Sequence, residues 1–315
     1  MPRIPAAYRP AVWVAWLVGA FLLLPMAGGP LYGIVIPGSA AALALLAPPA
    51  SAPEGRIDVR DLGAVLGIYA GVVGLFSLAF RYFTQERTAG LFVSFAAGLL
   101  LGVAGPVVYT VWMRTRPLAD LGLSRTEWGR AVALGLVLAG VQFALTLYGY
   151  ALPAPVDWVP LAALALVVGL FEAVFFRGFV QTRLAASFGT VPGVGAAAAL
   201  YALYHVGYGM GAREMLFLFG LGVVYAVAYA CTPNVLVLWP LLLPMGSFYN
   251  NLQGGEITMP WAAILGFVDV FGFMAAVIWL ARRHERRSHP TQVPPPTGRP
   301  VPQPLVLSSG GARRA

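Results

Sequence analysis

Long apolar runs divide the chain, separated by short segments that contain charged residues, proline or glycine. The runs are about 17–25 residues long, which is the length that an α-helix needs to cross a bilayer. They lack the alternation of apolar and polar positions that is typical of membrane β-strands. The pattern predicts about ten membrane-spanning helices. They cover approximately residues 11–28, 30–48, 61–80, 89–113, 130–150, 158–187, 191–209, 215–231, 235–252 and 259–281.

The first two runs are the least regular. Pro25, Pro30 and Pro37 interrupt them, so they form either two spans, a single long hairpin or a re-entrant piece. We interpret residues 11–28 as a retained span rather than a cleaved signal, because the run leads directly into the second one without a convincing cleavage site. We expect an all-α, polytopic transmembrane helix bundle with about 8–10 spans.

Composition supports a membrane protein. Hydrophobic residues make up 59% of the chain and charged residues only 10%, which is too few to cover a soluble domain of this size. The net charge is +8, but the arginines lie mostly beside apolar runs and in a C-terminal tail. We therefore interpret them as topology signals and as contacts with anionic lipid headgroups, and we expect no nucleic-acid partner.

The distribution of arginine predicts the orientation. With a cytoplasmic N-terminus and all spans crossing, the outside loops contain only Arg81, Arg87 and Arg213. Every other arginine outside the spans falls on the cytoplasmic side, as the positive-inside rule requires. We expect a multi-pass protein of the cell (inner) membrane with both termini cytoplasmic. Residues 282–315 are rich in proline and arginine and lack an apolar period, so we expect a disordered cytoplasmic tail.

Two charges lie inside an apolar run. Glu172 and Arg177 occur within residues 158–187, where an ionised group costs about 2.5–3.5 kcal/mol even on the most permissive insertion scale. On a regular α-helix, five residues correspond to a rotation of about 140° and a rise of ~7.5 Å. We therefore expect the two side chains not to pair with each other and to need partners from other helices.

Other spans offer a few polar partners. His205, four residues after Tyr201, is the only histidine outside the C-terminal segment. The ninth run ends in Ser247, Asn250 and Asn251. From the span limits, Glu172, His205 and Asn251 each lie ~20–24 Å from the inner end of their helix. They are therefore able to meet in one intramembrane cavity.

The available residues restrict the chemistry. A zinc site needs three or four His, Cys or carboxylate ligands, and the spans do not offer such a set. We therefore expect no metal and no other cofactor. No GxSxG or Ser-Lys arrangement accompanies Ser247, which disfavours a serine protease. A desolvated carboxylate that shares a water with His205, with Asn and Ser donors for an oxyanion, would hydrolyse an amide.

These residues resemble the CAAX protease and bacteriocin-processing (CPBP, or Abi) family of intramembrane endopeptidases. The family's Glu-Glu-x-x-x-Arg motif is matched by Glu172 and Arg177, followed by Gly178 and Phe179. Its Phe-x-x-x-His motif is matched by Tyr201 and His205, and its His-x-x-x-Asn motif retains Asn251. The resemblance covers about residues 117–252. It divides the chain into N-terminal helices (1–115), a CPBP-like core (116–281) and the tail (282–315).

The resemblance implies a role for each matched residue. Glu172 and His205 would activate water, Asn251 with Ser247 would support the oxyanion, and Arg177 would neutralise charge in the cavity. Two positions depart from the family pattern. Ala173 replaces the second glutamate, and Ser247 replaces the histidine of the third motif. Loss of one oxyanion donor costs about 10²–10³ in rate.

Three functional hypotheses follow. The first is an intramembrane endopeptidase that cleaves a membrane-associated protein or peptide. The second is a catalytically silent scaffold or immunity protein, which the substitutions at Ala173 and Ser247 favour. The third is a transporter or lipid-binding protein, which explains buried charge but not the motif spacing. The expected partners are membrane lipids and the membrane-associated protein or peptide substrate.

Overall fold

A computed structural model describes residues 4–24, 29–49, 57–82, 88–124, 128–147, 154–243 and 261–288. This part of the chain contains helices and no strands, which confirms the all-α fold. The longer helices are α1 (Arg9–Leu23), α2 (Pro30–Leu46), α3 (Val59–Tyr82), α4 (Thr88–Val108), α5 (Trp128–Leu147), α6 (Trp158–Glu172), α7 (Thr182–Phe188), α8 (Thr190–Leu203), α9 (Ala212–Cys231), α10 (Val235–Leu243) and α12 (Trp261–Ser288).

Short helical segments extend or connect these helices. Two are π-helical, with hydrogen bonds from residue i to i+5: η2 (Tyr109–Met113) continues α4, and η5 (Ala173–Gln181) joins α6 to α7. The others are 3₁₀ turns: η1 (Ala6–Tyr8), η3 (Leu118–Leu121), η4 (Pro155–Asp157) and η6 (Tyr204–Tyr208). Because η5 joins α6 and α7 without a break, residues 158–188 form one continuous helix.

Several helices have the length and composition to cross a membrane. Among the described residues six apolar stretches qualify, and α2 and the Gly98–Met113 segment are shorter apolar helices. Large apolar side chains such as Val18, Ile34 and Leu66 are more than half exposed, as expected for positions that face lipid. The chain is therefore a multi-pass membrane protein.

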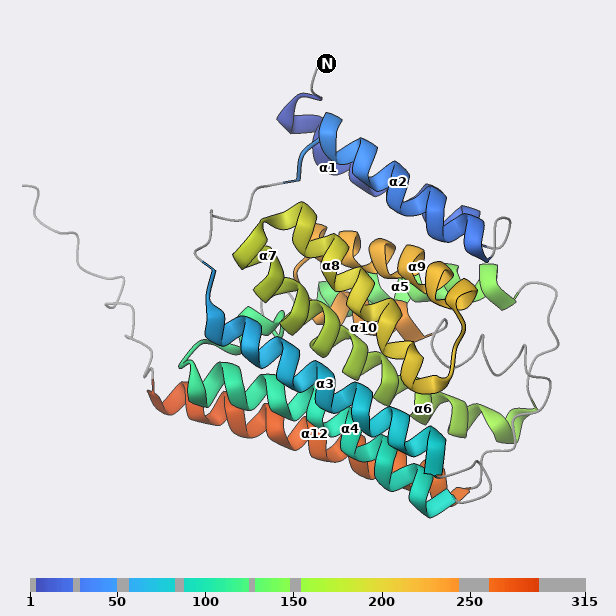
Figure 1. The fold of residues 1–315 in the computed structure, drawn as a ribbon, viewed down its shortest axis with the longest axis vertical. Helices are drawn as coiled ribbons and strands as arrows, with labels where there is room; N and C mark the ends of the chain where they lie inside the picture. The colour runs from blue at the N-terminus through green and yellow to red at the C-terminus, as the bar shows by residue number, and fades with distance from the viewer. Residues whose placement is uncertain are drawn as a thin grey trace, which may run out of the picture.

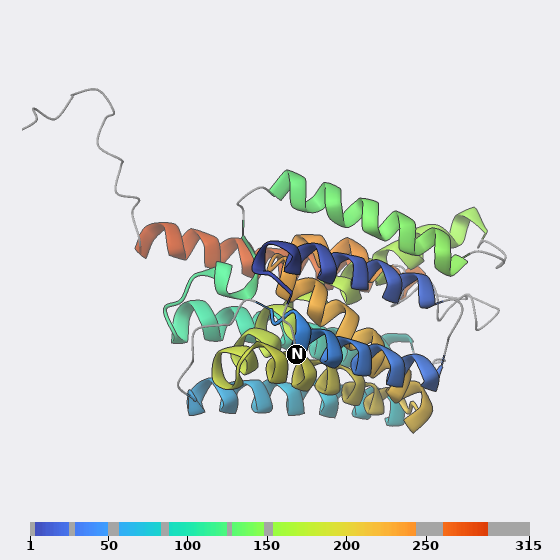
Figure 2. The ribbon, with the colours of Figure 1, turned by 90° about the horizontal axis from the view of Figure 1, so that it is seen from above.

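The α6–η5–α7 helix lies in the middle of the bundle. Figure 1 shows α3, α4 and α12 on one side of it, and α8 and α9 with the α1–α2 pair on the other. Figure 2 shows that the helices run broadly along one direction. In the most apolar 18-residue window of the Pro155–Phe188 span 65% of the residues are buried, against 11% in that of the first span and 28% in that of the last. A helix that is apolar all round belongs in such a central place.

Glycine permits two close contacts in this bundle. A Cβ on Gly178 in η5 would lie 2.3 Å from the carbonyl oxygen of Leu121, so only glycine lets η3 rest on the central helix. A Cβ on Gly33 in α2 would lie 2.0 Å from the carbonyl oxygen of Leu216 in α9. The first contact joins the central helix to the segment that follows η2, and the second joins the N-terminal helix pair to the core.

The last helix differs from expectation. It continues to Ser288 instead of ending near residue 281, because its charged end has partners. Arg282 Nη2 donates to the carbonyl oxygen of Leu123 at 3.1 Å, and Glu285 Oε1 accepts a hydrogen bond from the backbone N–H of Leu118. The expected disordered tail is therefore wrong for residues 282–288, and residues 289–315 lie outside the described part.

Candidate active site

The π-helical turn begins directly after Glu172 and changes the geometry that the sequence predicts. Bonding from i to i+5 makes residues five apart neighbours along the helix surface, as residues four apart are in an α-helix. Glu172 and Arg177 are five apart, so this bonding reduces the rotation between them below the value for an α-helix. The separation of about 140°, which holds for a regular α-helix, therefore does not apply here. Such π-helical turns occur frequently at functional sites.

A threonine stabilises the end of the π-helical turn. Thr182 Oγ1 donates to the carbonyl oxygens of Gly178, at 2.5 Å, and Phe179, at 3.0 Å. Both carbonyls belong to the last turn of η5. There the backbone hydrogen bonds change from the i to i+5 pattern back to the i to i+4 pattern, so the carbonyl oxygens change their N–H partners. The hydroxyl therefore satisfies acceptors at this transition.

Glu172 is held by two tyrosines from another helix. Its side chain is only 3% exposed. The Tyr204 hydroxyl donates to Oε1 at 2.6 Å, and the Tyr201 hydroxyl donates to Oε2 at 3.4 Å. A carboxylate needs such donors when it is removed from water, and hydrogen bonds to a charged group are the stronger class.

His205 lies on the same face of the α8–η6 segment as these tyrosines. Positions 201, 204 and 205 have the spacing i, i+3 and i+4, which places three side chains on one side of a helix. The imidazole packs on the Tyr204 ring with centroids 4.1 Å apart and on the Tyr201 ring at 5.2 Å. The carboxylate and the imidazole therefore contact the same two tyrosines, and Tyr204 lies close to both.

The histidine has a defined tautomer. Its Nδ1 lies 2.9 Å from the carbonyl oxygen of Tyr201. Because a carbonyl oxygen only accepts, Nδ1 carries the proton in this hydrogen bond. In the neutral ring Nε2 is then the basic nitrogen, and the helix backbone fixes its orientation.

Arg177 is the third charged or titratable group in this region. Its side chain is fully buried, and its guanidinium carbon lies 5.0 Å from the centroid of the Tyr201 ring. Within the described ranges none of its three nitrogens has a hydrogen-bond partner. A desolvated cation over an aromatic face gains about 2 kcal/mol. Tyr201 therefore contacts both Glu172 and Arg177.

Aromatic packing fixes the position of Tyr204. Its ring lies 4.8 Å from Phe176, 6.0 Å from Phe171 and 6.1 Å from Phe76, measured between centroids. Phe76 belongs to α3, which reaches η6 closely beside Gly207. Rings from the central helix and α3 thus enclose the phenol and leave its hydroxyl directed at Glu172.

The structure brings together part of the group that the sequence predicts. Glu172, Arg177, Tyr201 and His205 lie in one buried cluster. The expected residues Ser247, Asn250 and Asn251 lie outside the described part of the chain. Tyr204 is not among the residues predicted from the sequence, although its place one turn after Tyr201 and directly before His205 is the signal that indicates it.

A second polar cluster lies at the end of the central helix. Asp61, at the start of α3, accepts hydrogen bonds from Tyr109 at 2.7 Å and from Arg116 at 2.8 Å. Arg183 of α7 reaches Thr110 at 3.1 Å and lies 3.6 Å from Asp61. This cluster, which we call the ionic clamp, joins α3, η2 and α7. From the sequence, the arginines of this cluster are predicted only as topology signals.

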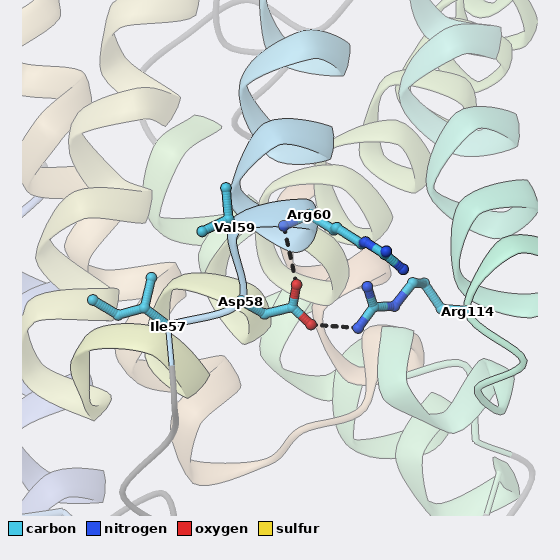
Figure 3. Close-up of a pocket in the computed structure, with 5 residues that line it drawn as sticks. All are labelled: Ile57, Asp58, Val59, Arg60 and Arg114. Atoms are coloured by element: carbon cyan, nitrogen blue, oxygen red, sulfur yellow. Dashed lines mark hydrogen bonds and ion pairs between the residues drawn. The ribbon is translucent and has the colours of Figure 1, made fainter.

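An open pocket of about 460 Å³ lies beside the ionic clamp (Figure 3). Asp58 accepts hydrogen bonds there from Arg114 and from the backbone N–H of Arg60. Partial burial acts to raise the pKa of Asp58, but the hydrogen bonds from Arg114 and from the Asp61 and Arg60 N–H groups outweigh it and lower the pKa. The ion pair with Asp58 raises the pKa of Arg114.

Metal ligands are not gathered in the described ranges. No group of three or more His, Cys, Asp or Glu side chains there lies close enough to hold a metal ion. The buried cluster offers a carboxylate able to take a proton, an oriented imidazole and two phenol donors.

Comparison with known proteins supports a protease family. Residues 154–243 match the sequence model of a family described as type II CAAX prenyl endopeptidase Rce1-like. The match contains Glu172, Arg177, Tyr201 and His205, and it is consistent with a CPBP family protein, which confirms the resemblance found in the motifs. No curated protein and no solved structure matches the chain.

Proposed function

We propose that the protein is an intramembrane endopeptidase that hydrolyses a peptide bond of a membrane-associated protein or peptide. Its expected place is the inner membrane, with both termini cytoplasmic. One observation carries the proposal: a carboxylate buried in a membrane-spanning helix is held by the hydroxyls of two tyrosines whose rings pack against an oriented imidazole. The match to an endopeptidase family over residues 154–243 supports the reaction class.

In the proposed reaction Glu172 is the general base. Its carboxylate takes a proton from a water molecule while the water oxygen bonds to the carbonyl carbon of the substrate. His205 orients this water through Nε2, because Nδ1 is held by the Tyr201 carbonyl. When the tetrahedral intermediate collapses, the C–N bond breaks and Glu172 returns the proton to the leaving amine.

The remaining residues have supporting roles. Tyr204 and Tyr201 position the carboxylate through their hydroxyls. Arg177 places a positive charge near the developing negative charge and offsets the burial of Glu172. Asn251 and Ser247 are proposed, from the resemblance, to support the oxyanion. Ser247 presents a hydroxyl where the family has an imidazole, so we expect a slow enzyme.

The test is cleavage by the full-length protein in proteoliposomes. The substrates are a panel of membrane-tethered fluorogenic peptides that includes a farnesylated C-terminal peptide and a single-span peptide. Glu172→Gln removes the base and is expected to reduce cleavage by about 10²–10⁴-fold. Asp157→Asn, at the start of the same helix, serves as the matched carboxylate control and is expected to retain activity. Undiminished cleavage by Glu172→Gln would exclude the mechanism.

A second candidate is a catalytically silent scaffold with the same cavity. Ala173 favours it, since a fully buried methyl group stands where the family has its second glutamate. On this alternative the folded wild-type protein cleaves no member of the panel, and Glu172→Gln behaves like the wild type. Cleavage by the wild type that depends on Glu172 would exclude the scaffold.

A further inference from the structure

A second cavity lies between the α1–α2 pair and the helices α8 and α9. It encloses about 650 Å³, within the range of about 300–1,000 Å³ found for small-molecule sites. The N-terminal pair contributes Trp13, Ala40 and Ala44, and α9 contributes Phe219 and Val223. Figure 1 shows the α1–α2 pair lying along α8 and α9. The cavity is distinct from the Glu172 cluster, because none of that cluster lines it.

The lining combines apolar walls with one positive charge. Among the described residues that line the cavity, Arg9 is the only charged one. Its Nε donates to the carbonyl oxygen of Ile4 at 3.2 Å, which holds the guanidinium at the start of α1. Within the described part of the chain Arg9 forms no ion pair. The cavity thus combines one cation without an ion-pair partner in the described residues, Arg9, with an otherwise uncharged lining.

The position of the cavity places that cation at the end of the helices. Ala6 lies in η1 and Arg9 at the start of α1, Pro48 follows α2, Thr190 begins α8 and Thr232 follows α9. α7, which carries Arg183 of the ionic clamp, ends directly before α8 begins, so these ends lie on the side of the bundle where the clamp lies (Figure 1). Val14 and Val191 line the cavity and are also 55% and 47% exposed, so its mouth adjoins apolar surface that faces lipid.

We infer that this cavity binds an anionic phospholipid, with an acyl chain between α2, α8 and α9 and the phosphate on Arg9. A phospholipid has the one anionic group and the apolar chain that the lining complements. A peptide helix does not fit, because at a diameter of about 10 Å only ~8 Å of its length would fill the volume. The inference concerns a site outside the matched motifs and does not depend on hydrolysis.

Native mass spectrometry of the purified full-length protein tests the headgroup. The protein in detergent is titrated with dioleoylphosphatidylglycerol or dioleoylphosphatidylcholine, which have the same chains. An arginine near an anionic headgroup favours the phosphatidylglycerol by about fivefold in apparent Kd. Arg9→Gln should abolish this preference, whereas Arg213→Gln, an exposed arginine at the start of α9, should preserve it.

A pair of glycine substitutions tests the acyl chain. Gly195 lines the cavity, and a Cβ there meets no atom within 4 Å, so Gly195→Phe would fill the cavity without straining the helix. If the new phenyl ring displaces two methylenes of the acyl chain, Gly195→Phe should weaken the binding of both lipids by roughly tenfold. Gly19→Phe is the matched control, since Gly19 has equally open space on α1 but does not line the cavity.

Three results would overturn the inference. They are equal affinity of the wild type for the two lipids, a preference that survives Arg9→Gln, and equal retention of lipid by Gly195→Phe and Gly19→Phe. Circular dichroism and thermal melting identify a variant that does not fold. The headgroup and chain arms use different residues, so either arm alone decides the outcome if the other variant is lost.

Discussion

Two tyrosine hydroxyls hold Glu172, but not equally. Tyr204 donates at 2.6 Å and Tyr201 at 3.4 Å, so the first hydrogen bond is the stronger. Tyr201 has a second contact, since its ring lies under the Arg177 guanidinium. The two phenols therefore have different main tasks. Tyr204 orients the Glu172 carboxylate, whereas Tyr201 lies between Glu172 and Arg177 and contacts both.

Tyr204→Phe tests this division. It removes the hydroxyl and keeps the ring among its aromatic neighbours, so the fold is expected to persist. A hydrogen bond to a charged group contributes about 1.5–3 kcal/mol, which corresponds to a loss of roughly 10–100-fold in kcat. Steady-state kinetics on a cleaved panel peptide measures the loss, and a pH–rate profile shows whether the proposed general base, Glu172, has been disturbed.

Two other tyrosines provide the controls. Tyr201→Phe should lower kcat less than Tyr204→Phe, because its hydroxyl lies farther from the carboxylate. Tyr69→Phe removes a hydroxyl that donates to the Leu200 carbonyl and should leave kcat unchanged. Equal losses for Tyr204→Phe and Tyr69→Phe would show that the effect is structural and would contradict the positioning role.

The sequence singled out the charged residues of the buried cluster but not their arrangement. Glu172, Arg177 and His205 stand out because charge and imidazole are rare in apolar spans. Tyr204 does not stand out, since a phenol is common in membrane helices and its role depends on the rotation of α8–η6 against the central helix. Contacts between helices far apart in the chain are not encoded in a local pattern.

At the scale of elements, the central helix combines two geometries. The apolar lengths predicted residues 158–187 as one span, and the structure has a continuous helix over 158–188. The π-helical stretch inside it could not be predicted from periodicity. Residues 169–181 are all buried, so no polar face alternates with an apolar one to reveal the period.

The contact between η5 and η3 yields a stability prediction. Gly178→Ala would place a methyl group 2.3 Å from the Leu121 carbonyl oxygen, so backbone must shift. Overpacking of this kind costs about 1–3 kcal/mol in the free energy of unfolding. Thermal melting in detergent measures the change. Gly63→Ala in α3, where a Cβ meets no atom within 4 Å, should be neutral or slightly stabilising. Equal melting temperatures for the two variants would refute the close contact.

The final helix shows how charge can mislead a prediction from sequence. The arginines after residue 280 suggested a solvated tail, and they are also favourable residues in a helix. Arg282 and Glu285 find backbone partners at residues 118–123, which extends α12 to Ser288. These partners lie more than 150 residues away in sequence, so composition alone could not indicate them.

At the scale of the whole molecule, charges at one end tie the outer helices to the central one. The ionic clamp links α3, η2 and α7, and Asp58 extends it to the open pocket. The sequence predicted that arginines gather at this end but not that aspartates at the start of α3 pair with them. The apolar runs predicted the helices, whereas the ion pairs depend on which helices lie side by side.

The pKa of Asp58 gives a pH prediction with a definite sign. Because its folded-state pKa lies below the ordinary value of about 3.9, Asp58 stabilises the fold above that value. The contribution is lost as the pH falls through the folded pKa. Asp58→Asn keeps the side-chain oxygen that accepts from the Arg60 and Asp61 N–H groups and removes the charge.

Melting temperatures between about pH 6 and pH 3 measure this contribution. The wild type should be more stable than Asp58→Asn near neutrality, and the difference should shrink on acidification. Arg60→Gln is a control, because only the backbone of Arg60 contacts Asp58 through a hydrogen bond. A difference between the wild type and Asp58→Asn that grows as the pH falls would contradict the sign.

The π-helical turn after Glu172 affects how such a membrane helix should be drawn as a helical wheel. A helical wheel with a uniform 3.6-residue pitch assigns Arg177 and Glu172 to different faces, although in the bundle they share one tyrosine neighbour. Mutational scans planned from such wheels would sort the pair into separate groups. A glutamate and an arginine that lie five positions apart in an unbroken apolar stretch should be plotted on an α-helical and on a π-helical wheel. Only then should either residue be assigned to a lipid-facing position.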